Sequence, residues 1–383
     1  MSERGSVIAL VAHRLASPSA TGIGRYYKEI ATSLAELGTR DRYLVATTRE
    51  PDEADWLPAQ LERRIVPGPR KAVALAWALT GHPTLDRFAG RPDLVHALHP
   101  WSATPTRAPL VTTIHDLMPI QHRAWYPRRE SWMFGRGVAH ARDHAELVIA
   151  DAEYGAAQLV AEANIERARI RVIHLAVSDR FRERAPAEHT ASVCARHGVE
   201  PGRFLIAVGQ IARRKNLSVV LRALAQVDSD ALGRPALLAV GPRGVGADEV
   251  DAEIDELGLG DRVRLGGYAD TVELPVLIGA SIALVHPSKD EGFGFTPIEA
   301  MASGVPCIAS ASGALPEVVG DAGVLLDPDD ADAWAGSITR VVSDPAWRAE
   351  LIGRGDRHQE RFRWARVAAE TAAVHHEILD REG

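Results

Sequence analysis

The chain has 383 residues, of which 46% are hydrophobic and 25% are charged, and its formal net charge at pH 7 is −7. The composition is typical of a soluble globular protein, and the length predicts two domains. The negative charge argues against nucleic acid as the main partner. Its two cysteines, Cys194 and Cys307, lie far apart in sequence and form neither a disulfide framework nor a metal-binding spacing.

The sequence also argues against a secreted or membrane-spanning protein. The residues before the first apolar run, at 7–12, lack the hydrophobic stretch of a signal peptide, and no apolar run reaches the ~18 residues of a membrane span. We therefore expect a cytoplasmic protein, with peripheral contact at the inner membrane face left open. Residues 125–134 mix aromatic side chains with arginines, so they either face a membrane surface or pack as part of a helix.

Short apolar runs alternate with helical patterns along the chain, which predicts parallel sheets with helices on both faces. The runs are rich in Val, Ile, Leu and Ala, which is typical of strands buried on both faces. In the first half we expect strands at 7–12, 43–46, 94–96, 110–114, 147–150 and 171–173, and helices at 25–37 and 155–163. In the second half we expect strands at 204–208, 236–240, 263–265, 282–285, 305–309 and 324–326, and helices at 217–226, 248–257, 271–280 and 333–342.

A polar stretch at 180–201 interrupts this alternation, and a new strand pattern begins at Phe204. We therefore predict an α/β fold with two doubly wound Rossmann-like domains. The first covers residues 1–178 and regains the C-terminal helix at about 361–383, and the second covers 179–360.

Ligands of open α/β sheets bind outside the carboxyl ends of the strands. Four polar or glycine-rich segments follow predicted strands, at 21–26, 115–116, 209–216 and 286–301. Two belong to each domain. If the domains face each other, all four segments meet in one interdomain cleft.

The first domain offers a glycine pair and a histidine. Gly22 and Gly24 would let the backbone approach a ligand before a helix that starts at Arg25, although a simple turn is the alternative. The full dinucleotide-binding pattern is absent, because Tyr27 occupies the place of its last glycine. His115 ends a strand, where it is either a hydrogen-bonded structural residue or a functional one. The adjacent Asp116 either orients it or caps the next turn.

In the second domain, three cations precede a helix that Asn216 is placed to cap. Arg213, Arg214 and Lys215 oppose the helix dipole there, which is unfavourable unless an anion lies between them. Lysine suits a phosphate as a point charge and arginine suits it as a bidentate donor. The alternative is a solvated basic loop.

The segment at 286–301 is the most informative part of the chain. A strand, a loop with Gly292 and Gly294, and a helix start together form an anion site, because unpaired backbone N–H groups point outward there. Glu299 completes a Thr-Pro-Ile-Glu sequence that fits a helix capping box, so it serves either as a cap or as a ligand for hydroxyls. Glu291 has no such structural role and predicts a sugar hydroxyl as partner. Paired carboxylates also occur in glycoside hydrolases, but two in one phosphate loop fit that chemistry poorly.

These motifs resemble the retaining, nucleotide-sugar-dependent glycosyltransferases of family four, which have the GT-B fold and include mannosyltransferases. The resemblance covers nearly the whole chain. It is carried by Gly-Ile-Gly-Arg-Tyr at 22–26, Ile-His-Asp-Leu at 114–117, Arg-Lys-Asn-Leu at 214–217, Glu-Gly-Phe-Gly-Phe-Thr-Pro-Ile-Glu-Ala-Met-Ala-Ser-Gly-Val-Pro at 291–306 and Leu-Pro-Glu-Val-Val-Gly-Asp-Ala at 315–322.

The resemblance implies that the second domain binds the donor and the first binds the acceptor. Within the donor site, Glu299 would hold the ribose and Glu291 the hydroxyls of the sugar, while His115 would lie beside the transferred sugar. The residues that it implies as catalytic are His115, Arg214, Lys215 and Glu291. Those that it implies as donor-binding are Gly22, Gly24, Arg213, Gly292, Phe293, Gly294, Phe295, Thr296 and Glu299.

One departure concerns the basic motif, where Gln210 follows the glycine in place of the arginine of many members. Arg213 or Arg214 would then supply that charge. None of the motifs quoted above contains an Asp-x-Asp triplet, so we expect neither a metal nor another cofactor.

We therefore predict a retaining transferase that moves a hexose, with GDP-mannose as the first choice of donor. The acceptor would be a hydroxyl of a glycan, a lipid-linked sugar or a natural product. The alternatives are another enzyme of this fold, such as a sugar phosphorylase or an epimerase, and a non-catalytic nucleotide-sugar binding protein.

Overall fold

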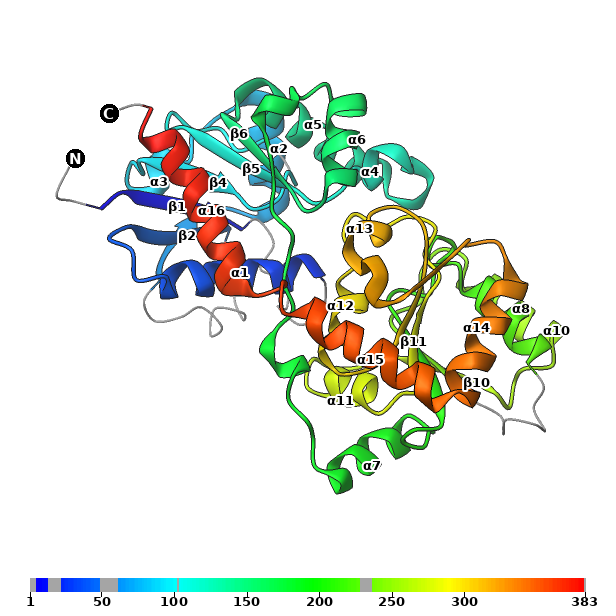
Figure 1. Cartoon of the computed structure of the whole chain (residues 1–383). Coiled ribbons are helices and arrows are strands. Elements are labelled where there is room, and N and C mark those ends of the chain that lie inside the picture. Colours follow the sequence, from blue (N-terminus) through cyan, green and yellow to red (C-terminus); the bar gives the residue numbers. More distant parts are fainter. Residues whose placement is uncertain (1–4, 13–21, 49–60, 102, 228–235, 382–383) are drawn as a thin grey trace. The chain divides into compact units, whose positions relative to one another are not determined.

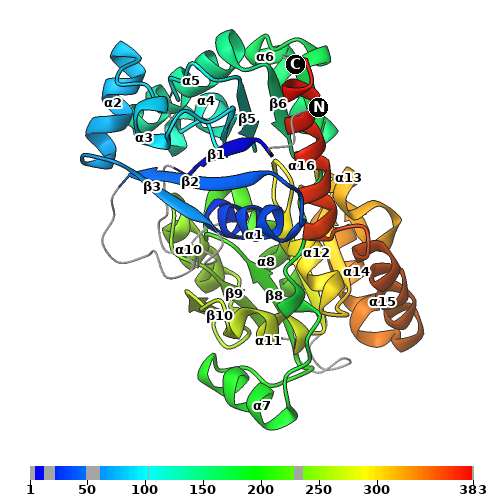
Figure 2. The same cartoon turned by 90° about the vertical axis from the view of Figure 1, so that its left-hand side faces the viewer.

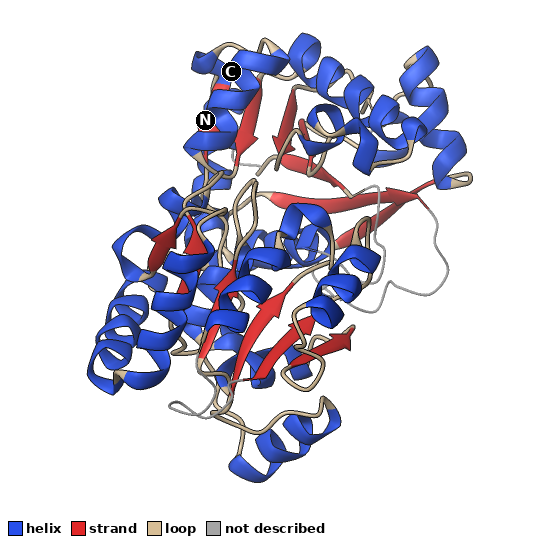
Figure 3. Cartoon of the chain, turned by 90° about the vertical axis from the view of Figure 1, so that its right-hand side faces the viewer, coloured by secondary structure: helices blue, strands red, loops and turns tan. Residues whose placement is uncertain are grey.

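The computed structural model of the protein describes residues 5–12, 22–48, 61–101, 103–227 and 236–381. It divides into two compact units, of which unit 1 is Met1–Leu175 with Trp364–Gly383 and unit 2 is Ala176–Arg363. Each unit is a parallel sheet with helices on its faces (Figures 1 and 3). The predicted α/β fold with two Rossmann-like domains is thereby confirmed.

Unit 1 contains a seven-stranded sheet in the order β3-β2-β1-β4-β5-β6-β7. The strands are β1 Val7–Val11, β2 Arg42–Thr48, β3 Glu62–Val66, β4 Leu94–Ala97, β5 Leu110–Ile114, β6 Leu147–Ala150 and β7 Ile170–Val172. The helices are α1 Gly22–Glu36, α2 Arg70–Thr80, α3 Asp86–Ala89, α4 Met118–Gln121, α5 Arg128–His144, α6 Glu153–Ala163 and α16 Trp364–Leu379, with 3-10 turns η2 Arg123–Trp125 and η3 Arg167–Arg169.

The central strands of this sheet are buried because helices cover both of their faces. Every residue of β4, β5 and β6 is buried, as expected for runs of apolar residues in a parallel sheet. The edge strand β3 was missed in the sequence. It reads Glu-Arg-Arg-Ile-Val and is partly exposed, and charged side chains are common on edge strands, where they hide the apolar pattern.

The C-terminal helix α16 belongs to unit 1 and packs against α1 (Figure 2). Helix α1 buries Tyr27, Ile30, Ala31 and Leu34, which share one helical face. A buried polar contact also fixes α16, because the His375 ring nitrogen Nε2 lies 3.0 Å from His96 Nδ1 on β4. Burial lowers the pKa of both histidines, that of His375 to about 3, so both rings are neutral at pH 7.

Unit 2 contains a six-stranded parallel sheet in the order β10-β9-β8-β11-β12-β13. The strands are β8 Phe204–Val208, β9 Ala236–Val240, β10 Val263–Gly267, β11 Ala283–His286, β12 Cys307–Ser310 and β13 Val324–Leu326. The helices are α7 Ala187–Arg196, α8 Leu217–Gln226, α10 Ala247–Glu256, α11 Glu273–Gly279, α12 Phe295–Ala302, α13 Leu315–Val319, α14 Ala331–Ser343 and α15 Pro345–Gln359, with 3-10 turns η4 Asp179–Phe181, η5 Arg213–Lys215 and η6 Gly320–Ala322.

The strands predicted in this half correspond to β8–β13. The polar stretch at 180–201 is not a structureless linker, because it forms η4 and α7 within unit 2. Two buried residues, Val193 and Cys194, anchor α7. Its charged residues lie at the surface, so its sequence pattern resembles that of a loop. Among the described helices, none is both long and apolar enough to cross a membrane.

Candidate active site

In unit 2, the segments that follow β8 and β11 lie against each other. The Lys289 N–H donates a hydrogen bond to the Arg214 carbonyl at 2.9 Å, and the Arg214 guanidinium donates one to the Asp290 carbonyl at 2.8 Å. Strands β8 and β11 are neighbours in the sheet. Their carboxyl ends therefore bring together two of the segments that the sequence singled out.

Glu291 is the centre of a cluster at this edge of the sheet. Its Oε1 lies 2.5 Å from Lys215 Nζ and 3.1 Å from a terminal nitrogen of Arg214. The ring of His286, the last residue of β11, places Nε2 at 3.2 Å from the same oxygen. Contrary to the expectation from the sequence, Glu291 therefore has a structural role, because it holds two cations together.

The charges of this cluster determine its protonation. Burial alone would raise the pKa of Glu291, but the positive charges of Lys215 and Arg214 and the hydrogen bond from His286 bring it well below its usual value. Burial lowers the pKa of His286, although Glu291 acts in the opposite direction. Burial lowers the pKa of Lys215, although the Glu291 carboxylate favours its charged form. A carboxylate held by the charged Lys215 and Arg214 beside a neutral imidazole leaves one positive charge in excess.

Two glycines make this close packing possible. Gly209 has φ +135°, and a Cβ atom there would lie 3.0 Å from Lys215 Cε. Gly313 has φ +60°, and a Cβ atom there would lie 2.7 Å from the backbone nitrogen and oxygen of Glu291. A larger residue at either position would be strained and would push against the cluster.

Arg213 is not brought into the cluster. Its guanidinium forms an ion pair with Glu249 on α10, and its side chain is 63% exposed. Gln210 is exposed and packs beside Gly244, where a Cβ atom would lie 2.6 Å from the Gln210 side chain. Of the two arginines that the sequence left open, Arg214 is the one that supplies charge next to Glu291 and Lys215.

The glycine loop of the segment ends in helix α12. Gly294 is the N-cap residue with φ +95°, and a Cβ atom there would lie 2.7 Å from Leu315. Gly292 is half-buried, and the Phe293 ring makes an edge contact with that of Phe295 at 5.7 Å. Phe295 and Thr296 form the first turn of α12 directly after this loop.

The capping-box interpretation of Glu299 is wrong. Helix α12 begins at Phe295 without a side-chain cap, so Thr296 lies inside the helix. Glu299 is 2% exposed on the buried face of α12. Of the two roles left open by the sequence, only that of a buried ligand-facing carboxylate stays as a prediction.

Asn216 also departs from its expected role. It occupies the N-cap position of α8 in the left-handed region with φ +52°, but its side chain makes no cap hydrogen bond. Its amide nitrogen instead donates to the Pro328 carbonyl at 2.7 Å. The residue therefore ties the basic turn η5 to the loop after β13.

In unit 1, His115 lies directly after β5 with its ring held at both nitrogens. Nδ1 is 2.7 Å from Oδ2 of Asp151, and Nε2 is 3.2 Å from the Leu98 carbonyl. The ring of Tyr26 on α1 packs edge-on against the His115 ring, with the centroids 4.6 Å apart. The Tyr26 hydroxyl lies 3.2 Å from Thr113 Oγ1. Strand ends β4, β5 and β6 and helix α1 thus converge on one imidazole.

One alternative next to His115 is decided by the structure. Asp116 caps the following turn, because its Oδ1 accepts the Met118 N–H at 3.0 Å. Gly22 and Gly24 already lie in helix α1, which was expected to begin at Arg25, and their approach to a ligand stays a prediction. Thr21, the first residue of that segment, lies outside the described residues.

Three members of these clusters were not assigned in the sequence, namely Tyr26, Asp151 and His286. Asp151 directly follows the apolar run of β6, which is the same signal that singled out His115. Applying that rule to every strand end would have found it. The pairing of His286 with Glu291 follows from the loop conformation, so it could not be read from the sequence.

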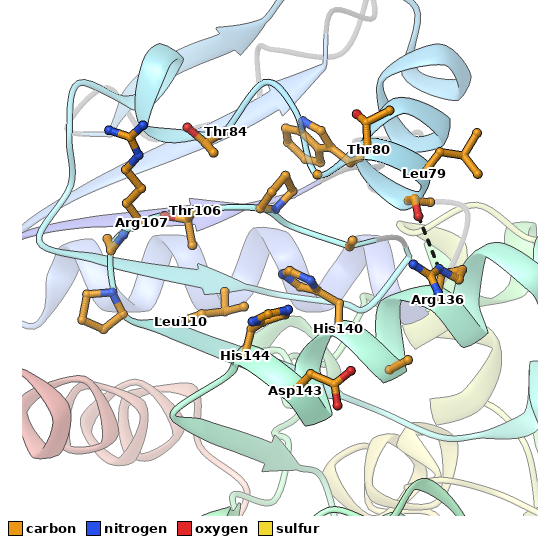
Figure 4. Close-up of a pocket in the computed structure, with 18 of the residues that line it drawn as sticks. Leu79, Thr80, Thr84, Thr106, Arg107, Leu110, Arg136, His140, Asp143 and His144 are labelled. Atoms are coloured by element: carbon orange, nitrogen blue, oxygen red, sulfur yellow. Dashed lines mark hydrogen bonds between the residues drawn. The ribbon is translucent and has the colours of Figure 1, made fainter.

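A separate cavity of about 630 Å³ lies in unit 1 at the opposite edge of the sheet. Its lining includes Leu110, the first residue of β5, and Glu146, which precedes β6. His140 and His144 of α5 point toward it, and Arg136 donates a hydrogen bond to the Ala78 carbonyl at 3.3 Å (Figure 4). None of the predicted site residues is among the described residues that line it.

The predicted absence of a metal stays a prediction. Within the part of the chain that the structure describes, no three or more His, Cys, Asp and Glu side chains gather in a way that could hold a metal ion.

Comparisons with known proteins identify the family. A model of Glycosyltransferase Family 4 matches residues 20–181, and one of Glycosyl transferases group 1 matches residues 195–358. The O-antigen chain mannosyltransferase B of Escherichia coli is 30% identical over 262 residues, which cover 68% of this chain and 68% of that protein. The chain belongs to the GT-B glycosyltransferases.

Two further proteins place this glycosyltransferase among its relatives. The D-inositol 3-phosphate glycosyltransferase of Mycolicibacterium smegmatis is 30% identical over 94% of the chain and 88% of that protein. The crystal structure of HepE from Anabaena, in complex with UDP and glucose, is similar in fold with a TM-score of 0.75 at 20% identity, over 97% of this chain and all of that one. The predicted enzyme class, a glycosyltransferase, is confirmed.

Proposed function

We propose that this glycosyltransferase moves a hexose from a nucleotide diphosphate sugar to an acceptor hydroxyl, with retention of the anomeric configuration and without a metal. The first choice of donor is GDP-mannose. Unit 2 binds the donor and unit 1 binds the acceptor. The enzyme works in the cytoplasm.

The observation that carries this proposal is the charge balance around Glu291. Lys215 and Arg214 outnumber the single carboxylate and are held in place by it, so the excess charge is already oriented before a ligand arrives. Preorganised groups of this kind stabilise the charge that develops on a departing diphosphate, each by about 3 kcal/mol. The N-terminal turn of α12 at Phe295 adds backbone donors for the same anion.

The proposed transfer needs no protein nucleophile. The bond between the anomeric carbon and the phosphate oxygen breaks, and its electron pair stays on the diphosphate. The acceptor oxygen forms a bond to the same face of that carbon, and its proton passes to an oxygen of the departing diphosphate.

Glu291 is a poor candidate for attack in this scheme, because its Oε1 is held by two cations and its pKa is well below the usual value. Its second oxygen is assigned to a hydroxyl of the donor sugar. Glu299 is assigned to the ribose, and His115 to an oxygen of the transferred sugar.

The relatives support parts of this proposal. One is named a mannosyltransferase of the O-antigen chain, and the HepE structure holds UDP and glucose. Others are named D-inositol 3-phosphate glycosyltransferases, so inositol phosphate joins glycans, lipid-linked sugars and natural products as a class of acceptor to test.

A lipid-linked acceptor would place the enzyme at the membrane surface. In the segment 125–134, Trp132 on α5 is 44% exposed and the neighbouring Arg128 and Arg129 are exposed as well, whereas Met133 and Phe134 are buried. One face of this segment therefore packs in the core, and the exposed aromatic and two cations support a membrane-surface role for the other face.

The test has two stages. A thermal-shift screen over nucleotide sugars should show stabilisation by one base and sugar, with GDP-mannose expected first. Release of free nucleotide is then measured with that donor in the presence and absence of each class of acceptor. Release that depends on the acceptor supports transfer.

The rival functions give other outcomes. Release that depends on inorganic phosphate would identify a phosphorylase, and conversion of the donor to its epimer would identify an epimerase. Binding without turnover of any kind would contradict the proposed activity. Stabilisation by a UDP sugar alone would replace the proposed donor but keep the reaction.

A further inference from the structure

The loop after β6 carries a carboxylate that neither the motifs nor the proposed mechanism uses. Asp151 is 2% exposed, and its Oδ2 lies 2.7 Å from His115 Nδ1. Its second oxygen, Oδ1, is buried and has no hydrogen-bond partner within the described part of the chain. His115 is therefore the group that compensates this buried carboxylate.

The contact of Nε2, the second nitrogen of the His115 ring, shows where one of the ring protons lies. His115 Nε2 faces the Leu98 carbonyl at 3.2 Å, and a carbonyl oxygen can only accept a hydrogen bond. Nε2 must then carry a hydrogen. The 2.7 Å hydrogen bond between Nδ1 and Asp151 Oδ2 needs a second proton. That proton lies either on Nδ1 or on the Asp151 carboxyl group.

The ordinary acidities decide between these two positions. An imidazole is a stronger base than a carboxylate, and Asp151 raises the pKa of His115, so the shared proton belongs on the histidine. A buried carboxylate without a counter-charge would also be strongly unfavourable. An imidazolium next to a carboxylate satisfies both groups.

We propose that Asp151 is a positioning residue that holds His115 as an imidazolium, with a proton on each ring nitrogen. Nε2–H is then a hydrogen-bond donor that a substrate oxygen can accept in place of the Leu98 carbonyl. The ring cannot act as a general base in this state. The catalytic meaning of this assignment rests on the proposed function, whereas the protonation state does not.

The surroundings of the ring are consistent with a charged state. Burial alone would lower the pKa of His115, but Asp151 and, to a smaller extent, Asp116 and the Leu98 carbonyl raise it above its usual value. The titratable groups that face the ring from the elements around it are Tyr26 on α1, His96 on β4, His99 after β4, Asp116 after β5 and Asp151 after β6.

The first experiment is a titration of the full chain labelled with ¹⁵N-histidine, followed by two-bond ¹H–¹⁵N correlation spectra from about pH 5.5 to 9. A spectrum of His115→Gln assigns the signals of His115. We expect both ring nitrogens to stay protonated above pH 6.5 in the wild type. A ring that is neutral at pH 6.5, or a proton found on Asp151, would overturn the proposal.

The variant Asp151→Asn separates charge from orientation, because the amide oxygen still accepts from Nδ1 but carries no charge. We expect the pKa of His115 to fall by at least about one unit. The matched control is Asp143→Asn on α5, which removes an exposed carboxylate beside His140 and His144 and should leave His115 unchanged. An unshifted His115 in Asp151→Asn would contradict the proposal. If Asp151→Asn does not fold, the pKa of His115 is measured in Asp151→Glu, which keeps the charge, and is compared with that of the wild type. The two values should then agree.

Kinetics then test the link to catalysis. The basic limb of the pH profile of kcat should move to lower pH in Asp151→Asn, with the rate at low pH largely restored. A merely structural carboxylate would lower the melting temperature without moving this limb, and that outcome would limit Asp151 to stability. If no transfer is found with any donor, the NMR titration still decides the protonation of His115.

Discussion

The two units place a buried carboxylate beside cations at the carboxyl ends of their strands, but with opposite charge balance. In unit 2, Glu291 faces Lys215 and Arg214, so positive charge is in excess. In unit 1, Asp151 faces His115, and Asp116 adds a second carboxylate nearby. The first arrangement favours an anion such as a diphosphate. The second favours a neutral hydroxyl, which can accept a hydrogen bond without bringing negative charge to two carboxylates.

This difference also separates what each cluster can do in a reaction. In the proposed reaction the cations of unit 2 stabilise a leaving group, whereas the charge of His115 is already neutralised by Asp151. The comparison therefore assigns the larger electrostatic role to unit 2. The following predictions test that assignment, from the largest expected effect to the smallest.

Removal of Lys215 should have the largest effect on turnover. Lys215→Ala deletes the closest cation to Glu291 and the excess charge with it, so we expect kcat to fall by about 10²- to 10³-fold. Lys289→Ala is the matched control, because that lysine is 48% exposed and pairs with Asp329 at the surface. Steady-state rates of nucleotide release measure both variants, and wild-type turnover in Lys215→Ala would refute the site in unit 2.

Neutralisation of Glu291 should mainly affect stability. Glu291→Gln leaves Lys215 and Arg214 close together without a compensating charge in a mostly buried site, which should cost about 3 kcal/mol of unfolding free energy. Urea unfolding followed by fluorescence measures this loss. Glu188→Gln on α7 is the control for removal of an exposed carboxylate. A stability equal to that of the wild type would mean that Glu291 is not needed to hold the two cations together.

The two clusters should respond to pH in opposite directions. The pKa of Glu291 is lowered by folding, so its contribution to stability is present above about pH 4.3 and is lost as the pH falls through the folded-state value. The pKa of His115 is raised, so its contribution is present below about pH 6.5 and is lost as the pH rises through the folded-state value.

Melting temperatures of the wild type, Glu291→Gln and His115→Gln from about pH 2 to about pH 9 isolate these contributions. The difference between the wild type and Glu291→Gln should shrink on the acid side, and the difference between the wild type and His115→Gln should shrink on the basic side. A difference for His115→Gln that grows with pH would show that the imidazole is held neutral.

The smallest effect is expected for Arg213. Its ion pair with Glu249 lies at the surface and away from Glu291, and exposed ion pairs contribute little. Arg213→Ala should therefore keep turnover within about twofold of the wild type. Arg214→Ala, measured in the same assay, should lose far more. Equal losses in both variants would place Arg213 at the donor and would restore the role that the sequence suggested.

Most of the fold could be read from the sequence, because buried parallel strands appear as continuous apolar runs. The clearest failures have a physical cause in common, namely that polar residues conceal structure. The charged edge strand β3 and the helix α7 look like loops, since few of their side chains are buried. The predicted starts of two helices were also too late, because the structure has α1 from Gly22 and α12 from Phe295. Glycine and proline patterns fit more than one position of a helix cap.

The sequence by itself determined the two Rossmann-like domains, the strand ends that carry the site, and the motifs that identify the family. Only the tertiary structure decided which side chains meet there. In the structure Glu291 pairs with Lys215, Arg213 pairs with Glu249, and His115 pairs with Asp151. Such pairs depend on strand order and on distances of a few ångströms between segments far apart in the chain, whereas apolar periodicity is a local property that each segment carries on its own.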